Sequence, residues 1–550
     1  MNKEVFPNRQ LNISDILKFR LRYVRPWEVA VIILVAAASA AISMLMPGFT
    51  KLLTGDVVEY KSMELLLAVA VFIVGAEFIS QLIKAVRTIV SGTMYLRLRK
   101  LTEGAVMERM LSLPISFYRR FQAGQLYSMM TAVGDLGDIF SDGLIAGLIS
   151  ALTSLVFVTR IVHFAPMLIL PALIIIIATT VLSIITVLIK KRVETGRRPL
   201  EAVENGVSLE MIRNAEKIKQ TGSEEAAYKK WERSYLASIE KKYDLPLLLK
   251  ISPAMIKAIN LFGALVIYYL AAKSGVEVSD YLAFNIAYGG LLSGIGTLSD
   301  TGLTFASIPP IYEMARPILE AVPEDESDKL PIENLQGDIE LKNVTFGYEK
   351  DRPVLKDISL HIRAGEYVAI VGETGCGKTT LIRLLLGLEK PDSGNIFYDG
   401  KDMETLSKKS LRKNMGAVIQ DGKLFRDDIL NNIVIGHNEL TEADAWEAAQ
   451  IAGIADEIRD LPLGMNTPIA ENCSDVSGGQ KQRILIARAV AHKPEVLILD
   501  EATSALNDEM QDQIMSELEK LSVTRIVVAH RMSAVKNAGR VITISDGSIC

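Results

Sequence analysis

Six long apolar runs, all within about the first 325 residues, constrain this chain more than any other feature. Each run is close to the roughly 20 residues that a helix needs to cross about 30 Å of hydrocarbon. We therefore expect residues 1–325 to form an all-α membrane domain with six spans. The expected spans are Val29 to Met46, Leu65 to Ile83, Gly143 to Val162, Met167 to Ile189, Ala254 to Ala272 and Tyr281 to Leu298.

The basic residues between these runs predict an orientation. Lys and Arg gather after the second and fourth runs, whereas the connections around Asp56, His163 and Glu277 are short and poor in them. Loops rich in Lys and Arg stay in the cytosol. The sequence therefore predicts that both termini and everything after the membrane domain are cytoplasmic.

Two cytoplasmic stretches, 84–142 and 190–253, are too long for simple loops and rich in helix-forming residues. We expect them to extend the membrane helices and to end in transverse segments near Pro114 to Gln125 and near Leu209 to Gln220. These segments either touch the soluble domain or are ordinary corners without a partner. The residues expected to interrupt or bracket them are Pro114, Gly124, Gly206 and Gly222.

Ionisable residues inside a span are costly and invite a functional interpretation. Lys257 could reach the inner membrane surface with its long side chain. Glu77 lies deeper, in a span that also carries Gln81. It could line a polar translocation path or make a structural hydrogen bond between helices.

Residues 326–550 read as a soluble α/β domain, and residues 371–380 match the phosphate-binding loop G-x-x-x-x-G-K-[ST] between an apolar strand and a helix. Glycines let consecutive N–H groups point at phosphate oxygens, while the lysine would reach the terminal phosphates and the threonine a Mg²⁺ ion. A chance glycine-rich turn is the alternative. The residues of this loop expected to bind the nucleotide are Gly372, Thr374, Gly375, Cys376, Gly377, Lys378, Thr379 and Thr380.

A second motif is the apolar run 496–499 followed by Asp500 and Glu501. A buried strand that ends in two carboxylates suits nucleotide hydrolysis. Asp500 would bind Mg²⁺, and Glu501 would orient and deprotonate the attacking water.

Residues 476–483, Val-Ser-Gly-Gly-Gln-Lys-Gln-Arg, resemble the L-S-G-G-Q signature of ATP-binding cassette (ABC) proteins. The resemblance implies that Tyr348 stacks on adenine, that Gln420 senses Mg²⁺ and the γ-phosphate, and that His530 contacts the γ-phosphate. The catalytic set is then Glu501, His530 and Gln420, the metal set is Thr379, Gln420 and Asp500, and the signature residues that bind nucleotide are Ser477, Gly478, Gly479 and Gln480.

The resemblance extends over the whole chain. It implies a six-helix, all-α transmembrane domain of the type I ABC exporter kind, fused to a soluble α/β P-loop nucleotide-binding domain that uses ATP and Mg²⁺. In that family the signature helix caps the nucleotide held by the other subunit, so a second half-transporter is expected. The other expected partners are the lipid bilayer and an exported peptide or amphipathic small molecule, with no nucleic acid.

The chain departs from the family pattern at two positions and in one short segment. Val476 stands for Leu, Asn507 for the usual Asp of the D-loop that begins at Ser504, and residues 470–473 lack the usual glycines. Lys378 and the motif carboxylates are kept, so hydrolysis is expected to be intact. The alternative is that the chain is the regulatory half of a heterodimer.

The cargo is suggested only by resemblance. Residues 420–424, 428–433 and 440–449 are similar to bacterial exporters of ribosomally made peptides, including bacteriocin systems with nitrile-hydratase-like leaders. We therefore expect a peptide exporter of the bacterial inner membrane, with a lipid or hydrophobic drug as the alternative cargo. The segment before the first span is short and lacks Cys, so no leader-cleaving peptidase domain is expected.

The cysteines, Cys376, Cys473 and Cys550, have no metal-binding spacing. Cys376 lies in the phosphate loop at the start of a helix, where a thiolate is favoured. We expect its alkylation to block ATP hydrolysis, with an inert buried thiol as the alternative.

Overall fold

The computed structural model of the chain describes residues 6–324, 329–349, 352–420, 422–437, 439–470, 476–503, 505–529, 535 and 538–550. The chain divides into two compact units, one of Met1–Leu113 with Phe117–Glu324 and one of Pro114–Ser116 with Asp325–Cys550. Each unit contains hydrophobic cores of its own.

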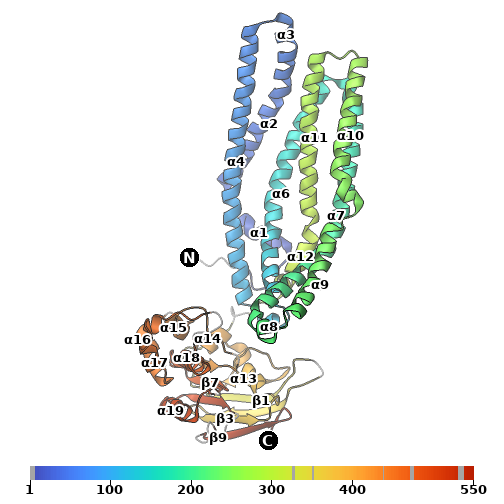
Figure 1. Cartoon of the computed structure of the whole chain (residues 1–550). Helices are drawn as coiled ribbons and strands as arrows, with labels where there is room; N and C mark the ends of the chain where they lie inside the picture. Colours follow the sequence, from blue (N-terminus) through green and yellow to red (C-terminus); the bar gives the residue numbers. More distant parts are fainter. Residues whose placement is uncertain are drawn as a thin grey trace. The chain divides into compact units, whose positions relative to one another are not determined.

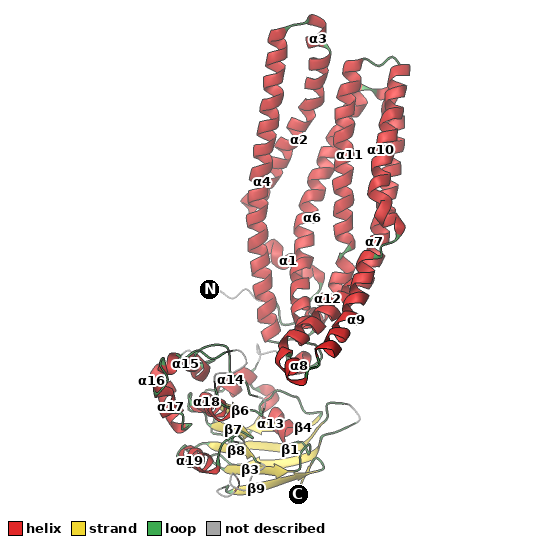
Figure 2. Ribbon diagram, viewed as in Figure 1, coloured by secondary structure: helices red, strands yellow, loops and turns green. Residues whose placement is uncertain are grey.

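The first unit is helical, and its described residues include six helices long and apolar enough to cross a membrane (Figures 1 and 2). This confirms the fold class expected from the six apolar runs. The long helices are α2 (Pro26–Thr54), α4 (Met63–Leu111), α6 (Ala123–Phe164), α7 (Ile169–Arg213), α10 (Leu247–Lys273) and α11 (Val278–Ala306). The shorter elements are α1 (Ile13–Tyr23), α3 (Asp56–Tyr60), α5 (Ile115–Tyr118), η1 (Pro166–Leu168), α8 (Ala215–Thr221), α9 (Glu224–Tyr243) and α12 (Ile308–Glu320).

Helices α6 and α11 pack closely because small residues line their contact. A side chain at Gly290 would overlap the ring of Phe157, and one at Gly294 would overlap the hydroxyl of Ser154. The Ser150 hydroxyl of α6 donates to the carbonyl of Gly294 at 2.7 Å. Close backbone approach and a hydrogen bond between helices are common means of helix association in a membrane.

Helix α1 is fastened to the bundle by buried charges. The Arg20 guanidinium is 3% exposed, lies 2.8 Å from Asp138 of α6 and donates to the Thr102 hydroxyl of α4 at 3.1 Å. Just beyond α1, Arg97 of α4 pairs with the buried Glu28 of α2 at 2.5 Å. A buried charge is tolerated only when it is paired and hydrogen-bonded, and these are.

Arg109, near the C-terminal end of α4, is 2% exposed and donates only to backbone carbonyls among the described residues. The acceptors belong to the two ends of the membrane unit. They are the carbonyls of Pro7, Arg9, Ile318, Leu319 and Ala321, at 2.7 to 3.1 Å.

The expected transverse segments correspond to the short helices α5 and α8. Helix α7, however, continues to Arg213, so the prediction that the second segment begins at Leu209 is wrong. Gly206 does not break the chain but lies buried inside α7, where a side chain on Gly124 of α6 would come within 3.3 Å of its Cα. Gly206 therefore serves close helix packing, and only Gly222, with φ of +59°, ends a helix.

The second unit contains two sheets within its described residues. The larger has the order β10-β9-β3-β8-β7-β6, parallel from β9 to β6, and the smaller is antiparallel with the order β2-β1-β4-β5. The strands are β1 (Ile339–Phe346), β2 (Leu355–Ile362), β3 (Tyr367–Gly372), β4 (Ser393–Tyr398), β5 (Lys401–Asp402), β6 (Met415–Val418), β7 (Val496–Asp500), β8 (Thr524–Val528), β9 (Arg540–Ser545) and β10 (Ser548–Ile549).

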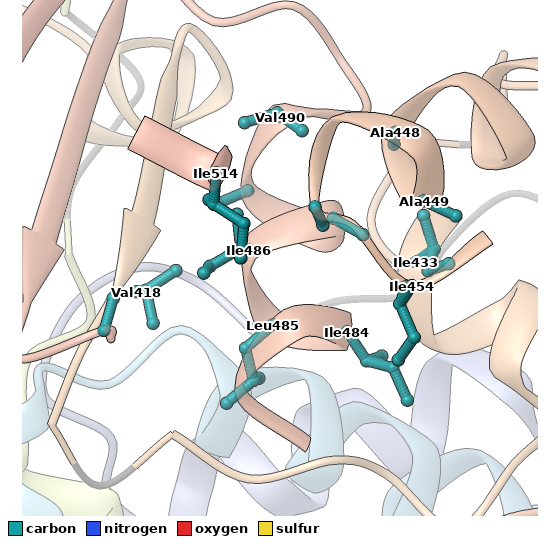
Figure 3. Close-up of a cluster of buried hydrophobic side chains, with 14 of the residues drawn as sticks. Val418, Ile433, Ala448, Ala449, Ile454, Ile484, Leu485, Ile486, Val490 and Ile514 are labelled. Atoms are coloured by element: carbon teal, nitrogen blue, oxygen red, sulfur yellow. The ribbon is translucent and has the colours of Figure 1, made fainter. Parts of the chain in front are cut away.

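Helices pack against the larger sheet of this unit around a hydrophobic core. The cluster drawn in Figure 3 brings together Val418 at the end of β6, Ile433 of α15, Ala448 of α16, Ile486 of α18 and Ile514 of α19. It fixes α18 against the edge of the larger sheet where the site lies. The helical elements are α13 (Lys378–Leu385), η2 (Met403–Thr405), α14 (Lys408–Lys413), α15 (Ile429–Val434), α16 (Glu442–Ile451), α17 (Ala455–Arg459), η3 (Gly464–Asn466), α18 (Gly478–Val490) and α19 (Asp508–Glu519).

Candidate nucleotide site

The loop between β3 and α13 has the backbone that a phosphate-binding loop requires. Gly372, Gly375 and Gly377 have φ angles of 155°, 87° and 108°. A side chain at Gly372 would overlap the carbonyl of Ile544, and one at Gly377 would lie 2.7 Å from Leu355. Only glycine fits these positions, so the motif read from the sequence coincides with a tight strand-to-helix turn.

The Lys378 ammonium is held against this loop. The side chain is 6% exposed, and its Nζ donates to the carbonyls of Gly372 and Glu373 at 2.7 and 2.8 Å. These bonds satisfy the buried charge and place it beside the backbone N–H groups of the turn. Thr379 and Thr380 follow it in the first turn of α13.

Asp500 ends β7, whose five residues are all buried. β3 and β7 are parallel, with only β8 between them, so the phosphate loop and Asp500 come to the same edge of the sheet. Asp500 is 1% exposed, and neither carboxylate oxygen has a hydrogen-bond partner among the described residues. Burial raises the pKa of Asp500, opposed by the neighbouring Thr379 hydroxyl and the Lys378 ammonium.

Two of the predicted catalytic residues meet at this edge. The Gln420 amide donates from Nε2 to Glu501 Oε2 at 3.0 Å, although 81 positions separate them in the chain. Glu501 itself has φ of +53°, a left-handed conformation that is uncommon for a residue with a side chain. Backbone strain of this kind concentrates at functional sites.

The signature residues form the start of α18. Ser477 is the N-cap: its hydroxyl accepts from Gln480 N at 3.2 Å, and Gln480 Oε1 accepts from Ser477 N at 2.9 Å. Gln480 also donates to Glu457, which pairs with Arg483 at 2.6 Å. Ser477 and Gly478 are exposed in the single chain, so this helix start is open to a ligand.

Gln482 is a residue to which the sequence assigned no role. Its Oε1 accepts from Ala505 N at 2.9 Å, and its Nε2 donates to the carbonyl of Glu501 at 3.5 Å. The signature helix is thereby connected to the backbone of Glu501 and to the segment that follows it. The available signal was its place two residues after Gln480, on the helix that follows the motif.

Tyr348 lies just after β1, and its ring is 46% exposed. Its hydroxyl is 3.3 Å from the Thr380 hydroxyl and accepts from Arg383 at 3.1 Å. These bonds hold the ring beside α13, the helix that begins at the phosphate loop. The structure therefore places Tyr348 next to the loop, with its ring partly exposed and in edge contact with Phe346.

Several sequence predictions fall outside the described residues. They concern His530, Ser504 and residues 471–473 with Cys473. Asn507 is described, and its Oδ1 accepts from Met510 N at 3.1 Å as the N-cap of α19. Asn and Asp cap helices about equally well, so this departure from the family pattern keeps its local structural role.

Both parts of the chain match profiles of one protein family. The profile described as "ABC transporter transmembrane region" matches residues 29–294, and the profile described as "ABC transporter" matches residues 355–504. The chain belongs to the ABC transporter family. With its six spanning helices it is a multi-pass membrane protein with the half-transporter architecture that the sequence predicted.

Individual proteins of the family are also similar to this ABC transporter. The chain is 29% identical over 453 residues, or 81% of its length, to the alpha-hemolysin translocation ATP-binding protein HlyB of Escherichia coli O157:H7. It is 28% identical to the leukotoxin translocation ATP-binding protein LktB of Mannheimia haemolytica, again over 81% of this chain. The matched region spans 64% of the length of each of these two relatives.

A solved structure supports the fold. A bacterial Atm1-family ABC exporter with ATP bound superposes with a TM-score of 0.81, covering 95% of this chain and 94% of its own, at 24% identity. This likeness confirms the type I exporter fold of the ABC transporter described here.

In the membrane unit of this ABC transporter, Glu77 is exposed and accepts from Gln81 at 2.5 Å within α4. The expected alternative was a hydrogen bond between helices, and the observed bond is local. A cavity of about 760 Å³ lies between α2, α4, α6 and α11, and Glu77 is not among the residues that line it.

Proposed function

We propose that this chain is one half of an ATP-driven export pump that moves a peptide or polypeptide out of the cytosol by alternating access. The observation that carries the proposal is that one chain combines six membrane-spanning helices, one phosphate loop and one signature helix whose start is exposed. A pump of this architecture is complete when two chains associate.

In the proposed site, the nucleotide phosphates lie in the glycine-rich turn, where Lys378 and the N–H groups of residues 374–380 stabilise their charge. Tyr348 offers its exposed ring to the adenine, and its hydroxyl bonds hold the ring near the phosphate loop.

The donor set fits Mg²⁺, a hard cation that prefers oxygen ligands. Asp500 presents two buried oxygens that have no hydrogen-bond partner in the described part of the chain, Thr379 is its neighbour, and Gln420 contacts the adjacent Glu501. The ion would neutralise charge on the phosphates. Glu501 would orient and deprotonate the attacking water, with its carboxylate positioned by Gln420 and its backbone by Gln482.

The second chain supplies what the first leaves open. The first turn of α18, from Ser477 to Gln480, points free N–H groups and the positive end of the helix dipole outward, which suits the phosphates held by a partner. The capping box uses the N–H groups of Ser477 and Gln480, which leaves those of Gly478 and Gly479 for a ligand. Two nucleotides would thus lie between two chains, and their hydrolysis would release the pair.

Peptide or polypeptide cargo is supported by relatives. Those named above are described as translocation proteins for alpha-hemolysin and leukotoxin. Their match includes both the membrane unit and the second unit, which contains the phosphate loop and is called the ATPase unit from here on, because it covers 81% of this chain.

The test is to purify the chain in lipid nanodiscs and to measure ATP turnover and the number of chains per particle with and without Mg-ATP. Glu501→Gln should abolish turnover and retain two nucleotides in a stable two-chain particle. The matched control is Glu495→Gln, an exposed carboxylate just before β7, which should turn over ATP like the wild type. A Glu501→Gln protein that hydrolyses ATP normally, or that stays a single chain with ATP, would contradict the proposal.

A further inference from the structure

The cavity of about 760 Å³ in the membrane unit has a lining that points to a ligand. It is formed by α2, α4, α6 and α11, four helices that pack on one another. Its wall carries apolar side chains such as Ile149 and Phe157 beside several hydroxyl groups. A pocket of this size and mixed character suits a ligand with an apolar body and a polar end.

The charges of this cavity are of one sign. Lys84 and Arg87 both line it from α4, and no carboxylate is among the described residues that do so. They are three positions apart, so they lie on the same face of the helix. Among the described residues, neither side chain makes an ion pair or a hydrogen bond.

This differs from other cations of the same helices. Lys51 of α2 pairs with Asp280 at 2.7 Å, and Arg97 of α4 pairs with Glu28 at 2.5 Å. Lys84 lies 21 residues after Met63, the first residue of α4, which is roughly 31 Å along the helix at 1.5 Å per residue. That depth is near the inner boundary of the hydrocarbon, where a charge without a counter-ion is expensive.

Two hydroxyl groups add further polar atoms to the wall of the cavity. Ser91 lies one turn beyond Arg87, and Ser293 faces the same cavity from α11. Neither makes a side-chain hydrogen bond among the described residues, so both can donate to a ligand. Two cations and two free hydroxyls are the donors that a carboxylate or phosphate group prefers.

We propose that this cavity binds the cargo through an anionic group, so that the exported molecule is an acidic amphipathic peptide. The inference rests on the proposed export function and adds the charge of its cargo. Lys84 and Arg87 attract the acidic group, while Ile149 and Phe157 hold the apolar residues next to it. The rival anion at this depth is a phospholipid headgroup. The position of Arg87, half-buried between four helices, favours the cargo.

The experiment measures binding and transport separately. The probes are a dansyl-labelled amphipathic decapeptide with three Asp and the same peptide with three Asn. In phosphatidylcholine nanodiscs, fluorescence anisotropy should show that the wild type binds the Asp peptide at least about 5-fold more tightly, the effect of a single weak charge interaction. The double variant Lys84→Gln/Arg87→Gln should bind both peptides equally.

Two further variants exclude trivial outcomes. Lys84→Arg/Arg87→Lys keeps both charges and should retain the preference. Lys257→Gln removes an exposed cation of α10 that does not line the cavity, and it should retain the preference as well. Thermal unfolding of each variant shows that it is folded. Equal binding of both peptides by the wild type, or a preserved preference in the double Gln variant, overturns the inference.

Anionic lipid separates the two sources of negative charge. If nanodiscs with 30% phosphatidylglycerol abolish the wild type's preference, the cations serve lipid headgroups and the inference is overturned. An unchanged preference supports it. ATP-driven uptake of the Asp peptide into proteoliposomes tests the proposed function itself. A preference in binding without any uptake would refute peptide export and leave the anion site standing.

Discussion

Asp500 illustrates at the scale of one residue how a ligand site is prepared. Its side chain is almost fully buried, it has no hydrogen-bond partner among the described residues, and burial raises its pKa. An acid whose pKa is raised by folding favours the folded state below its ordinary value of about 3.9. That contribution is lost as the pH rises through the raised pKa, so at neutral pH the ionised group opposes folding.

Asp500→Asn should therefore stabilise the nucleotide-free protein while abolishing ATP turnover. We expect the melting temperature of the ATPase unit to rise by about 2–4 °C per kcal/mol of relieved repulsion and desolvation. Differential scanning fluorimetry at pH 7.5 without Mg²⁺ measures it, with Glu495→Gln as the surface control. An unchanged or lower melting temperature would contradict the cost assigned to the buried charge.

Cys376 gives a chemical test of the phosphate loop. Its thiol is free and partly exposed, and its Sγ fills the space where a side chain on Gly372 would lie. N-ethylmaleimide at this position should abolish ATP hydrolysis, because the adduct would occupy the volume of the phosphates. Bound Mg-ATP should slow the reaction. The Cys376→Ser protein should keep its activity under the same treatment, and full activity after complete modification of wild-type Cys376 would sink this prediction.

Residue roles could be read from the sequence where a motif is contiguous. Gly372 and Gly377 of the phosphate loop lie where a side chain would clash, so the spacing of these glycines predicts the shape of the turn. The sequence indicates separate roles for Gln420, by family resemblance, and for Glu501, but not the contact between them. The link from Gln482 to Ala505 and the left-handed backbone of Glu501 could not be predicted, because they depend on how α18 packs against the segment that follows β7.

At the scale of elements, the α6–α11 contact depends on the absence of side chains. Gly290→Ala should push against the ring of Phe157 and destabilise the membrane unit by about 1–3 kcal/mol, the usual cost of overpacking. The neighbouring Gly289→Ala is the matched control, since a side chain there meets nothing within 4 Å. Thermal unfolding in nanodiscs should rank the two variants, and equal stability would show that the contact relaxes without cost.

Element boundaries were predicted less well than element types. The apolar runs located all six spanning helices, because roughly 20 apolar residues have few other uses. The sequence predicts that Gly206 brackets the second transverse segment, whereas it lies inside α7 against Gly124. A glycine that ends a helix and one that admits a neighbouring helix look the same in sequence, and only the partner distinguishes them.

At the scale of the whole molecule, acid sensitivity should originate in the ATPase unit. His492 stacks on His437 with ring centroids 4.2 Å apart, and burial, aided by that neighbour, lowers the pKa of His492 to about 4. A base with a lowered pKa stabilises the fold fully above its ordinary value of about 6.5 and loses this as the pH falls towards 4. The residues that oppose the shift include Glu439.

The melting temperature of the ATPase unit should therefore fall between pH 7 and pH 5. His492→Phe, which can still stack on His437 but cannot gain a proton, should flatten that slope. His361→Gln, a change at an exposed histidine of β2, should leave the slope as it is. If the Phe variant loses stability with acid as steeply as the wild type, another group is responsible.

The whole chain's family and fold could be inferred from its motifs and apolar runs, but the inner wall of the membrane unit could not. Sequence drew attention to Glu77 because a carboxylate inside a span is conspicuous, yet Glu77 bonds within its own helix. Lys84 and Arg87 look like ordinary inner-surface anchors in sequence. Their contribution to a shared cavity depends on three other helices.

The guanidinium of Arg109 has a mechanical consequence. It grips carbonyls near residue 7 and near residue 320 together, and Leu11 N also donates to Leu319 O at 2.8 Å. Residues 7–11 and 318–321 are thus held together by hydrogen bonds at one point on α4. A rotation of α12 would therefore have to move residues 7–11 with it, or break these hydrogen bonds.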